Sequence, residues 1–309
     1  MNWIDADKLM AACREGDLAT IRAALAKHDV KRTLLLSDNY CRNLLHIACW
    51  HNKPEIVRAI LGVPDGISHV INGRDLVGLH PIHSVCQGGY VEVLKLLLEH
   101  PATLVFQVDE HGWTCMHHAA AQGHAAIIRL LVPHITDRVP ETVRYLFTQP
   151  RARCSLIPFD LARANPHIEA VKMFLVFGPP WVPTALSTFS RHEATRILLK
   201  SYEADREATV GRLRVELGFA LEDAAALFAI IVFLSEGLID FCSKERVRDR
   251  FLIARRTRDR RFLRILGRLP MELQMRLCCL TFELDIPHLL SDRTEHAFSA
   301  LAGLCLHMK

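Results

Sequence analysis

The sequence predicts an all-α fold, in which a solenoid of stacked helical repeats is followed by a C-terminal helical domain. Three histidines, His46, His83 and His117, recur at separations of 37 and 34 residues. An aliphatic segment with helical spacing follows each of them. Half of the 309 residues are hydrophobic, which is enough for a sizeable core. A regular period of this length is typical of repeat proteins, in which each unit buries its apolar face against its neighbours.

The repeated segments resemble the ankyrin family, whose unit reads Asp-x-x-Gly-x-Thr-Pro-Leu-His-x-Ala-Ala-x-x-Gly-His before an aliphatic helix. The third segment matches this unit at Asp109, Gly112, Thr114, His117, Ala119, Ala120, Gly123, His124, Ile127, Ile128, Leu130 and Leu131. The second matches at Asp75, Gly78, Pro81, Ile82, His83 and Gly89, and the first at Asp38, Leu45, His46 and Ala48, with Asn52 where glycine is usual. The resemblance implies helix–turn–helix repeats with β-turn fingers, and protein binding rather than catalysis.

Individual residue types fit places in such a repeat. Thr114 can accept a hydrogen bond from a free backbone N–H at a helix start, and Pro81 suits the first helical turn. Gly89 and Gly123 suit the positive φ that follows a helix end. In the family, the ring of the framework histidine bonds to neighbouring backbone, and the same is expected of His83 and His117.

The repeat pattern weakens toward both of its ends. Residues 5–36 are expected to form a capping repeat, with Asp7 as the N-cap of its first helix. Three clear units are then predicted at about 38–71, 72–107 and 108–132. An insertion at 133–155 precedes two degenerate units, at about 150–178 and 180–200. The first of these carries Asp160 in the position of the histidine.

Beyond residue 205 the ankyrin pattern stops. Residues 205–266 are predicted to be a helical linker or capping region, in which the apolar stretch from Ala224 to Leu234 forms a buried helix. Residues 244–268 contain eleven Lys or Arg against three acidic residues. This basic segment is interpreted as a solvated helix face, and the alternative is a nuclear-import signal or a patch for an acidic partner.

Residues 268–302 begin with Leu269-Pro270-Met271-Glu272-Leu273, which resembles the opening of an F-box, and the order of segments resembles viral ankyrin proteins with a PRANC domain. That resemblance implies a helix that docks on the Skp adaptor of a cullin ubiquitin ligase. The adaptor-binding residues would be Leu269, Pro270, Glu272, Leu273 and Leu277. Two alternatives are a SOCS box, which the stretch also faintly resembles, and a structural cap of the solenoid.

Composition limits the other classes of function. The net charge of +4 does not indicate nucleic-acid binding, and no leader or membrane-spanning stretch is visible. Ten cysteines without a leader, and without a Cys-x-x-Cys pair, indicate a reduced intracellular protein without a zinc site. We therefore expect a cytoplasmic protein, with the nucleus as the alternative. No phosphate loop, His-Glu-x-x-His or nucleophile elbow is present, so neither catalysis nor a cofactor is expected.

The resemblance places partner binding on the finger tips and on the exposed side of each first helix. The expected partner-binding residues are Asn39, Tyr40, Arg42, Trp50, His51, Leu76, Val77, Leu79, Gln87, Glu110, His111, Trp113 and Gln122. Tyr40, Trp50 and Trp113 are the preferred anchors because aromatic side chains dominate interface energetics. Trp113 could instead pack against a neighbouring finger.

The predicted function is recognition of a protein partner through the concave ankyrin surface. The sharper hypothesis is a substrate receptor, in which the repeats hold a target while residues 268–302 dock a Skp–cullin ligase. The alternatives are a plain scaffold or inhibitor, and a nuclear regulator that uses the basic segment.

Overall fold

The computed structural model describes residues 6–27, 30–63, 67–138, 156–178, 182, 190–219, 224–225, 228–229, 274 and 278. The chain divides into two compact units, Met1–Arg206 and Glu207–Lys309. The adaptor-binding residues Leu269, Pro270, Glu272, Leu273 and Leu277, and the basic segment 244–268, lie outside the described residues.

The described part of the chain is helical and contains isolated β-bridges but no strand. Its helices are α1 (Ala6–Glu15), α2 (Leu18–Lys27), α3 (Val30–Leu34), α4 (Leu44–Trp50), α5 (Pro54–Leu61), α6 (Ile67–Ile71), α7 (Pro81–Gly88), α8 (Val91–Glu99), α9 (Cys115–Gln122), α10 (Ala125–Arg138), α12 (Pro158–Ala164), α13 (Ile168–Phe177), α14 (Glu193–Ala204) and α15 (Arg206–Glu216). The predicted all-α ankyrin solenoid is confirmed.

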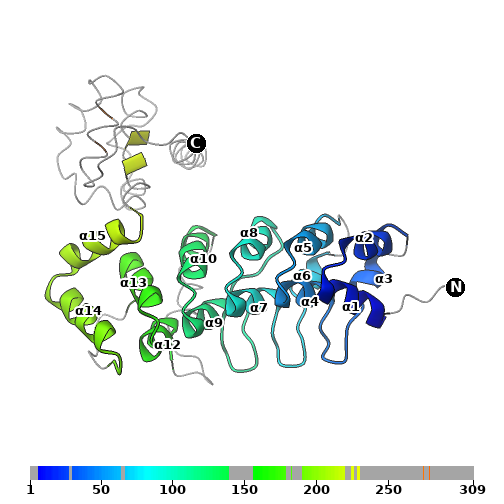
Figure 1. Ribbon diagram of the computed structural model, residues 1–309, viewed down its shortest axis with the longest axis horizontal. Coiled ribbons are helices and arrows are strands. Elements are labelled where there is room, and N and C mark those ends of the chain that lie inside the picture. The colour runs from blue at the N-terminus through cyan, green and yellow to red at the C-terminus, as the bar shows by residue number, and fades with distance from the viewer. Residues whose placement is uncertain are drawn as a thin grey trace. The chain divides into compact units, whose positions relative to one another are not determined.

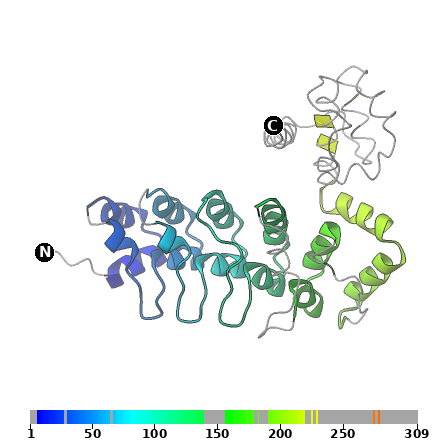
Figure 2. The same cartoon turned by 180° about the vertical axis from the view of Figure 1, so that it is seen from behind.

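The first unit stacks its helices in two rows, as Figures 1 and 2 show. An inner row consists of α1, α4, α7, α9 and α12, and each of these helices packs on the next. The outer row consists of α2, α5, α8, α10 and α13. Long loops, the fingers, project from the side of the inner row between one repeat and the next.

The residue pattern explains both rows. In α5 the side chains of Ile56, Val57 and Ile60 are buried while Glu55 and Arg58 face solvent, as an amphipathic outer helix requires. Inner helices are buried on more sides. Small residues at their contacts, such as the fully buried Ala119 and Ala120 of α9, let neighbouring inner helices approach closely.

The glycine and proline predictions hold. Gly89 and Gly123 follow α7 and α9 with φ values of 74° and 76°, and Pro81 lies in the first turn of α7. Asn52, which replaces the usual glycine after α4, also adopts a positive φ of 51°. Asparagine tolerates this conformation better than most residues because its short polar side chain can bond locally.

One of the two capping predictions was wrong. Thr114 lies at the N-cap of α9 as expected, and its backbone N–H and its hydroxyl both contact Nδ1 of His117, at 3.2 and 2.8 Å. Asp7 lies inside α1, which already begins at Ala6, so Asp7 belongs to the first turn of this helix.

The structure also shows local helix that the sequence pattern did not indicate. Helix α10 continues through Pro133 to Arg138, inside the expected insertion, and α14 continues to Ala204. In the second unit, Ala224, Ala225, Phe228 and Ala229 are helical and buried, as are Gln274 and Cys278. Among the described residues, no helix combines the length and apolarity that a membrane crossing requires.

Candidate binding surface

Each finger begins with an aspartate that folds the loop around its own side chain. Oδ1 of Asp75 accepts hydrogen bonds from the backbone N–H groups of Val77 and Leu79, at 3.0 and 2.8 Å. Asp38 and Asp109 make the same pair of bonds two and four residues ahead. Because the turn is fixed by these bonds, the finger presents its tip residues in a defined geometry.

Neighbouring fingers are also bonded to each other. The N–H of Leu76 donates to the carbonyl of Tyr40 at 3.0 Å, and the N–H of Glu110 donates to the carbonyl of Val77 at 3.4 Å. The three fingers therefore form one ribbon beside the inner helices (Figure 1).

The framework histidines join each repeat to the next. Nδ1 of His83 accepts a hydrogen bond from the N–H of His80, and Nε2 lies 3.1 Å from the carbonyl of Gln107. Since Nδ1 is an acceptor, the ring must be neutral with its proton on Nε2. His46 and His117 make the equivalent pairs of contacts, to Leu79 and Leu156 respectively. The expected bonding of these rings to backbone is confirmed.

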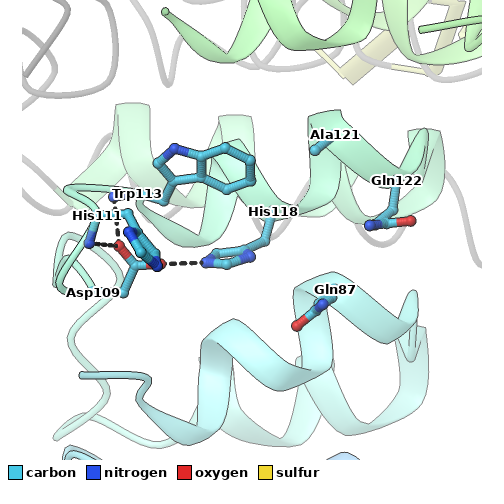
Figure 3. Close-up of a pocket in the computed structure, with 7 residues that line it drawn as sticks. All are labelled: Gln87, Asp109, His111, Trp113, His118, Ala121 and Gln122. Atoms are coloured by element: carbon cyan, nitrogen blue, oxygen red, sulfur yellow. Dashed lines mark hydrogen bonds and ion pairs between the residues drawn. The ribbon is translucent and has the colours of Figure 1, made fainter. Parts of the chain in front are cut away.

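The larger cavity on this surface lies between α7, α9 and the third finger, and has a volume of about 360 Å³. Gln87, Asp109, His111, Trp113, His118, Ala121 and Gln122 line it. Figure 3 shows the indole of Trp113 beside the ring of His118, with Gln87 and Gln122 farther along the two inner helices. The ring centroids of Trp113 and His118 lie 5.3 Å apart in an edge-to-face arrangement.

A buried pair, Asp109 and His118, forms one side of this cavity. Nε2 of His118 lies 3.1 Å from Oδ2 of Asp109 (Figure 3). Burial lowers the pKa of His118, although the adjacent Asp109 carboxylate acts in the opposite direction. The pair is therefore best described as a neutral imidazole that donates a hydrogen bond to a carboxylate.

A second cavity, of about 200 Å³, lies between the first and second fingers. Its lining residues are Tyr40, Arg42, His46, Trp50, Asp75, Val77, Leu79 and Ser84. The guanidinium of Arg42 lies 2.7 Å from Asp38 and stacks 4.9 Å from the centroid of Tyr40. Its cation thus already has both a carboxylate and an aromatic ring as partners.

Most of the predicted partner-binding residues line one of these two cavities, and four of them line neither. The larger cavity gathers Gln87, His111, Trp113 and Gln122, and the smaller one gathers Tyr40, Arg42, Trp50, Val77 and Leu79. Asn39, His51, Leu76 and Glu110 are exposed but line neither cavity. Trp113 lies against His117 and His118 of its own repeat, at centroid distances of 6.3 and 5.3 Å.

Sequence reasoning missed Asp109 and His118 as site residues. Asp109 was assigned only to the fold, and His118 was not singled out. The available signal was that the residue after the framework histidine is Ile47 in the first unit and Ser84 in the second, but a second histidine in the third. In the described part of the chain, no group of three or more His, Cys, Asp or Glu side chains is arranged to hold a metal ion.

Comparison with known proteins agrees with the fold. Residues 67–142 match the family model of ankyrin repeats in three copies. A rice protein described as a probable E3 ubiquitin-protein ligase, XBOS32, is 28% identical over 193 residues, which cover 56% of this chain and 38% of the rice protein. Human NF-kappa-B inhibitor alpha is 31% identical over 104 residues, 32% of either chain.

A human channel, transient receptor potential cation channel subfamily A member 1, is 28% identical over 134 residues, 42% of this chain but 11% of the channel. The chain thus spans about two fifths or less of the length of each of these three relatives. The shared region is a protein–protein interaction module of ankyrin repeats, found in proteins of very different kinds.

Proposed function

We propose that the fingers and inner helices of this chain bind a protein partner, without catalysis. The observation that carries the proposal is a cluster of exposed apolar side chains on the first two repeats. Tyr40, Trp50, Leu76 and Val77 are 62%, 43%, 58% and 50% exposed. Three of them line the smaller cavity, and Leu76 lies beside Val77 on the same finger. Apolar clusters of this kind mark interaction sites on proteins.

The test is quantitative capture from cells with three forms of the full chain. The forms are the intact protein, a Trp50→Ala/Leu76→Ser variant, and an Ile197→Ser variant. Ile197 lies on α14 and is as exposed as Leu76, so its loss controls for removing an exposed apolar side chain elsewhere. A partner recovered by the intact and Ile197→Ser forms but lost from the double variant supports the proposal. Equal recovery by all three forms contradicts it.

A second candidate is a substrate receptor of a Skp–cullin ubiquitin ligase. Its support is the F-box-like residues 268–302 together with the similarity to the rice protein. Gln274 and Cys278 of this segment are helical and buried. A plain scaffold or inhibitor remains the alternative.

Affinity purification with a Leu269→Ala/Pro270→Ala/Leu273→Ala variant separates these two candidates. Recovery of a Skp adaptor and a cullin with the intact chain alone, while circular dichroism shows that the variant is folded, would support the receptor. If neither protein is recovered with either form, the scaffold is left.

We also propose that the protein works in a reducing compartment, the cytoplasm or the nucleus. All six described cysteines are free, and Cys13, Cys49, Cys86 and Cys115 are buried at successive repeats. Burial raises the pKa of the Cys13 thiol to about 12, which suits a packing role. Thiols of this kind persist where the surroundings are reducing.

A further inference from the structure

Asp109 is a buried carboxylate with no Lys or Arg paired to it in the described part of the chain. Asp109 is 5% exposed, and its two oxygens accept hydrogen bonds from the backbone of His111 and Trp113 and from the ring of His118. The matching aspartate of the first finger, Asp38, pairs with Arg42. Across the described residues, no Lys or Arg pairs with Asp109.

The cavity beside Asp109 therefore carries a net negative charge. Its seven lining residues include no Lys or Arg, and His118 is kept neutral by burial. A buried carboxylate without a cationic partner is costly, and a cation that enters the cavity relieves part of that cost.

Other groups around the cavity also favour a cation. Because Nε2 of His118 donates to Asp109, the second ring nitrogen, Nδ1, carries a lone pair and can accept a hydrogen bond. No described residue bonds to this nitrogen. The indole of Trp113 forms one wall, and the amide oxygens of Gln87 and Gln122 are further acceptors (Figure 3). An aromatic face with acceptors near a carboxylate is a favourable environment for an ammonium or guanidinium group.

We propose that this cavity receives a basic side chain, Lys or Arg, from the protein partner. The inference rests on the proposed function and names the chemistry that one part of the surface recognises. The side chain would bond through its terminal N–H groups to Nδ1 of His118 and to the glutamine amides, with Asp109 supplying the countercharge. A cavity of about 360 Å³ has room for either side chain.

The smaller cavity does not suit the same guest. It contains Arg42, and the charges of Arg14, Lys53 and Arg42 all act on the adjacent His51, whose pKa is lowered first by burial and then by these cations. The cavity also contains the carboxylate of Asp75, but Arg42 already occupies the aromatic face of Tyr40 and would repel a second cation there. The two cavities therefore select different parts of a partner: apolar groups at the first two repeats and a basic group at the third.

The test measures binding of small side-chain probes to the full chain labelled with 5-fluorotryptophan. The protein has four tryptophans, so the ¹⁹F spectrum is simple, and a Trp113→Phe variant assigns the Trp113 signal. The probes are the N-acetyl methylamides of lysine, arginine, norleucine and glutamate. We expect saturable shifts of the Trp113 signal with lysine or arginine, in a roughly millimolar range typical of such small ligands. Norleucine and glutamate should cause no saturable shift.

Gln122 offers a matched pair of variants, because it lies at the cavity and its side chain is exposed. Gln122→Lys places a cation at the site and should weaken lysine binding by at least about tenfold, while Gln122→Glu should tighten it by roughly threefold at low salt. Asp109→Asn should abolish binding, since asparagine can keep the two backbone bonds without the charge. If that variant does not fold, the comparison of lysine affinity between Gln122→Lys and Gln122→Glu still tests the proposal.

Two results would overturn the inference: norleucine or glutamate shifting Trp113 as strongly as lysine, or equal lysine affinity for Gln122→Lys and Gln122→Glu. These results are separate from the test of the proposed function. A chain that captures partners through Trp50 and Leu76 but does not bind the lysine probe keeps its function and loses this site. A chain that binds the lysine probe but captures no protein keeps this site and loses the proposed function.

Discussion

At the scale of single residues, the first finger differs from its neighbours because a side chain occupies a glycine position. Cys41 has φ +59°, where the next two fingers place Gly78 and Gly112 at +74° and +80°. The left-handed conformation costs a residue with a Cβ about 1–2 kcal/mol. Cys41 is exposed, so burial of its side chain does not offset this cost.

We predict that Cys41→Gly stabilises the protein. Relief of the strained backbone outweighs the greater freedom of glycine in the unfolded chain, so the free energy of unfolding should rise by about 0.5–1 kcal/mol. Asn52→Gly is the matched control: its φ is +51°, and asparagine tolerates this region, so its change should be smaller. Urea unfolding measures both, and a lower stability of Cys41→Gly would contradict the argument.

The sequence identified residues with local roles more readily than residues that act across the fold. Gly89 and Gly123 could be predicted because each follows a helix end. The pairing of Asp109 with His118 could not, because it depends on how the finger folds back over α9.

At the scale of elements, each framework histidine joins the start of one inner helix to the backbone that leads into the next repeat. In the degenerate unit, Asp160 takes this place and accepts one long bond, 3.4 Å, from the N–H of Ile157. The carboxylate is shorter than an imidazole, and its other partner among the described residues is Arg163 of its own helix. The degenerate unit therefore lacks, among the described residues, the bond to the next repeat that a framework histidine makes.

We predict that His83→Ala costs much more stability than Asp160→Ala. Removing the buried imidazole leaves the N–H of His80 and the carbonyl of Gln107 without their partner and opens a void, which should cost about 2–4 kcal/mol. Loss of the partly exposed Asp160 should cost less than about 1 kcal/mol. Chemical denaturation of the two variants checks the order, and similar losses would show that the histidine connection is not special.

Helices could be predicted from the sequence where apolar residues at helical spacing were bounded by a residue that starts or ends a helix, such as proline or glycine. The predicted helix boundaries were wrong where side-chain packing outweighed a local sequence signal such as a proline. Helix α10 passes through Pro133, since the proline lies on an exposed side of the helix while Leu131, Val132 and Ile135 are buried around it. The predicted partner-binding residues come from separate repeats that only the stacked fold brings together, so the sequence could indicate a candidate surface but not its division into two cavities.

At the scale of the whole molecule, the buried imidazoles make stability depend on pH. Burial lowers the pKa of His46 from 6.5 to about 4, and it also lowers the pKa values of His80, His83 and His118. Below pH 6.5 these histidines become protonated in the unfolded chain, whereas in the folded chain they stay neutral to a lower pH. The stabilisation is therefore complete above pH 6.5 and is lost as the pH falls toward about 4.

We predict that the urea midpoint is constant between pH 8 and about pH 7 and falls steadily between about pH 6.5 and 4.5, well before most carboxylates titrate. Each histidine with a lowered pKa contributes up to about 1.4 kcal/mol per pH unit in this window. A His46→Gln variant should flatten the slope, whatever its stability at neutral pH. A midpoint independent of pH down to 4.5 would show that these rings are protonated in the folded chain.

The ribbon of fingers has a mechanical consequence. Each inner helix packs on the next, whereas the hydrogen bonds between neighbouring fingers in the described residues are few, as between Leu76 and Tyr40. A bending load on the stack would therefore separate the fingers while the inner helices act as the hinge line. We expect the first unit to bend elastically by opening on its finger side. A partner bound between two fingers would then strain the repeats, and this elastic energy would be released when the partner dissociates.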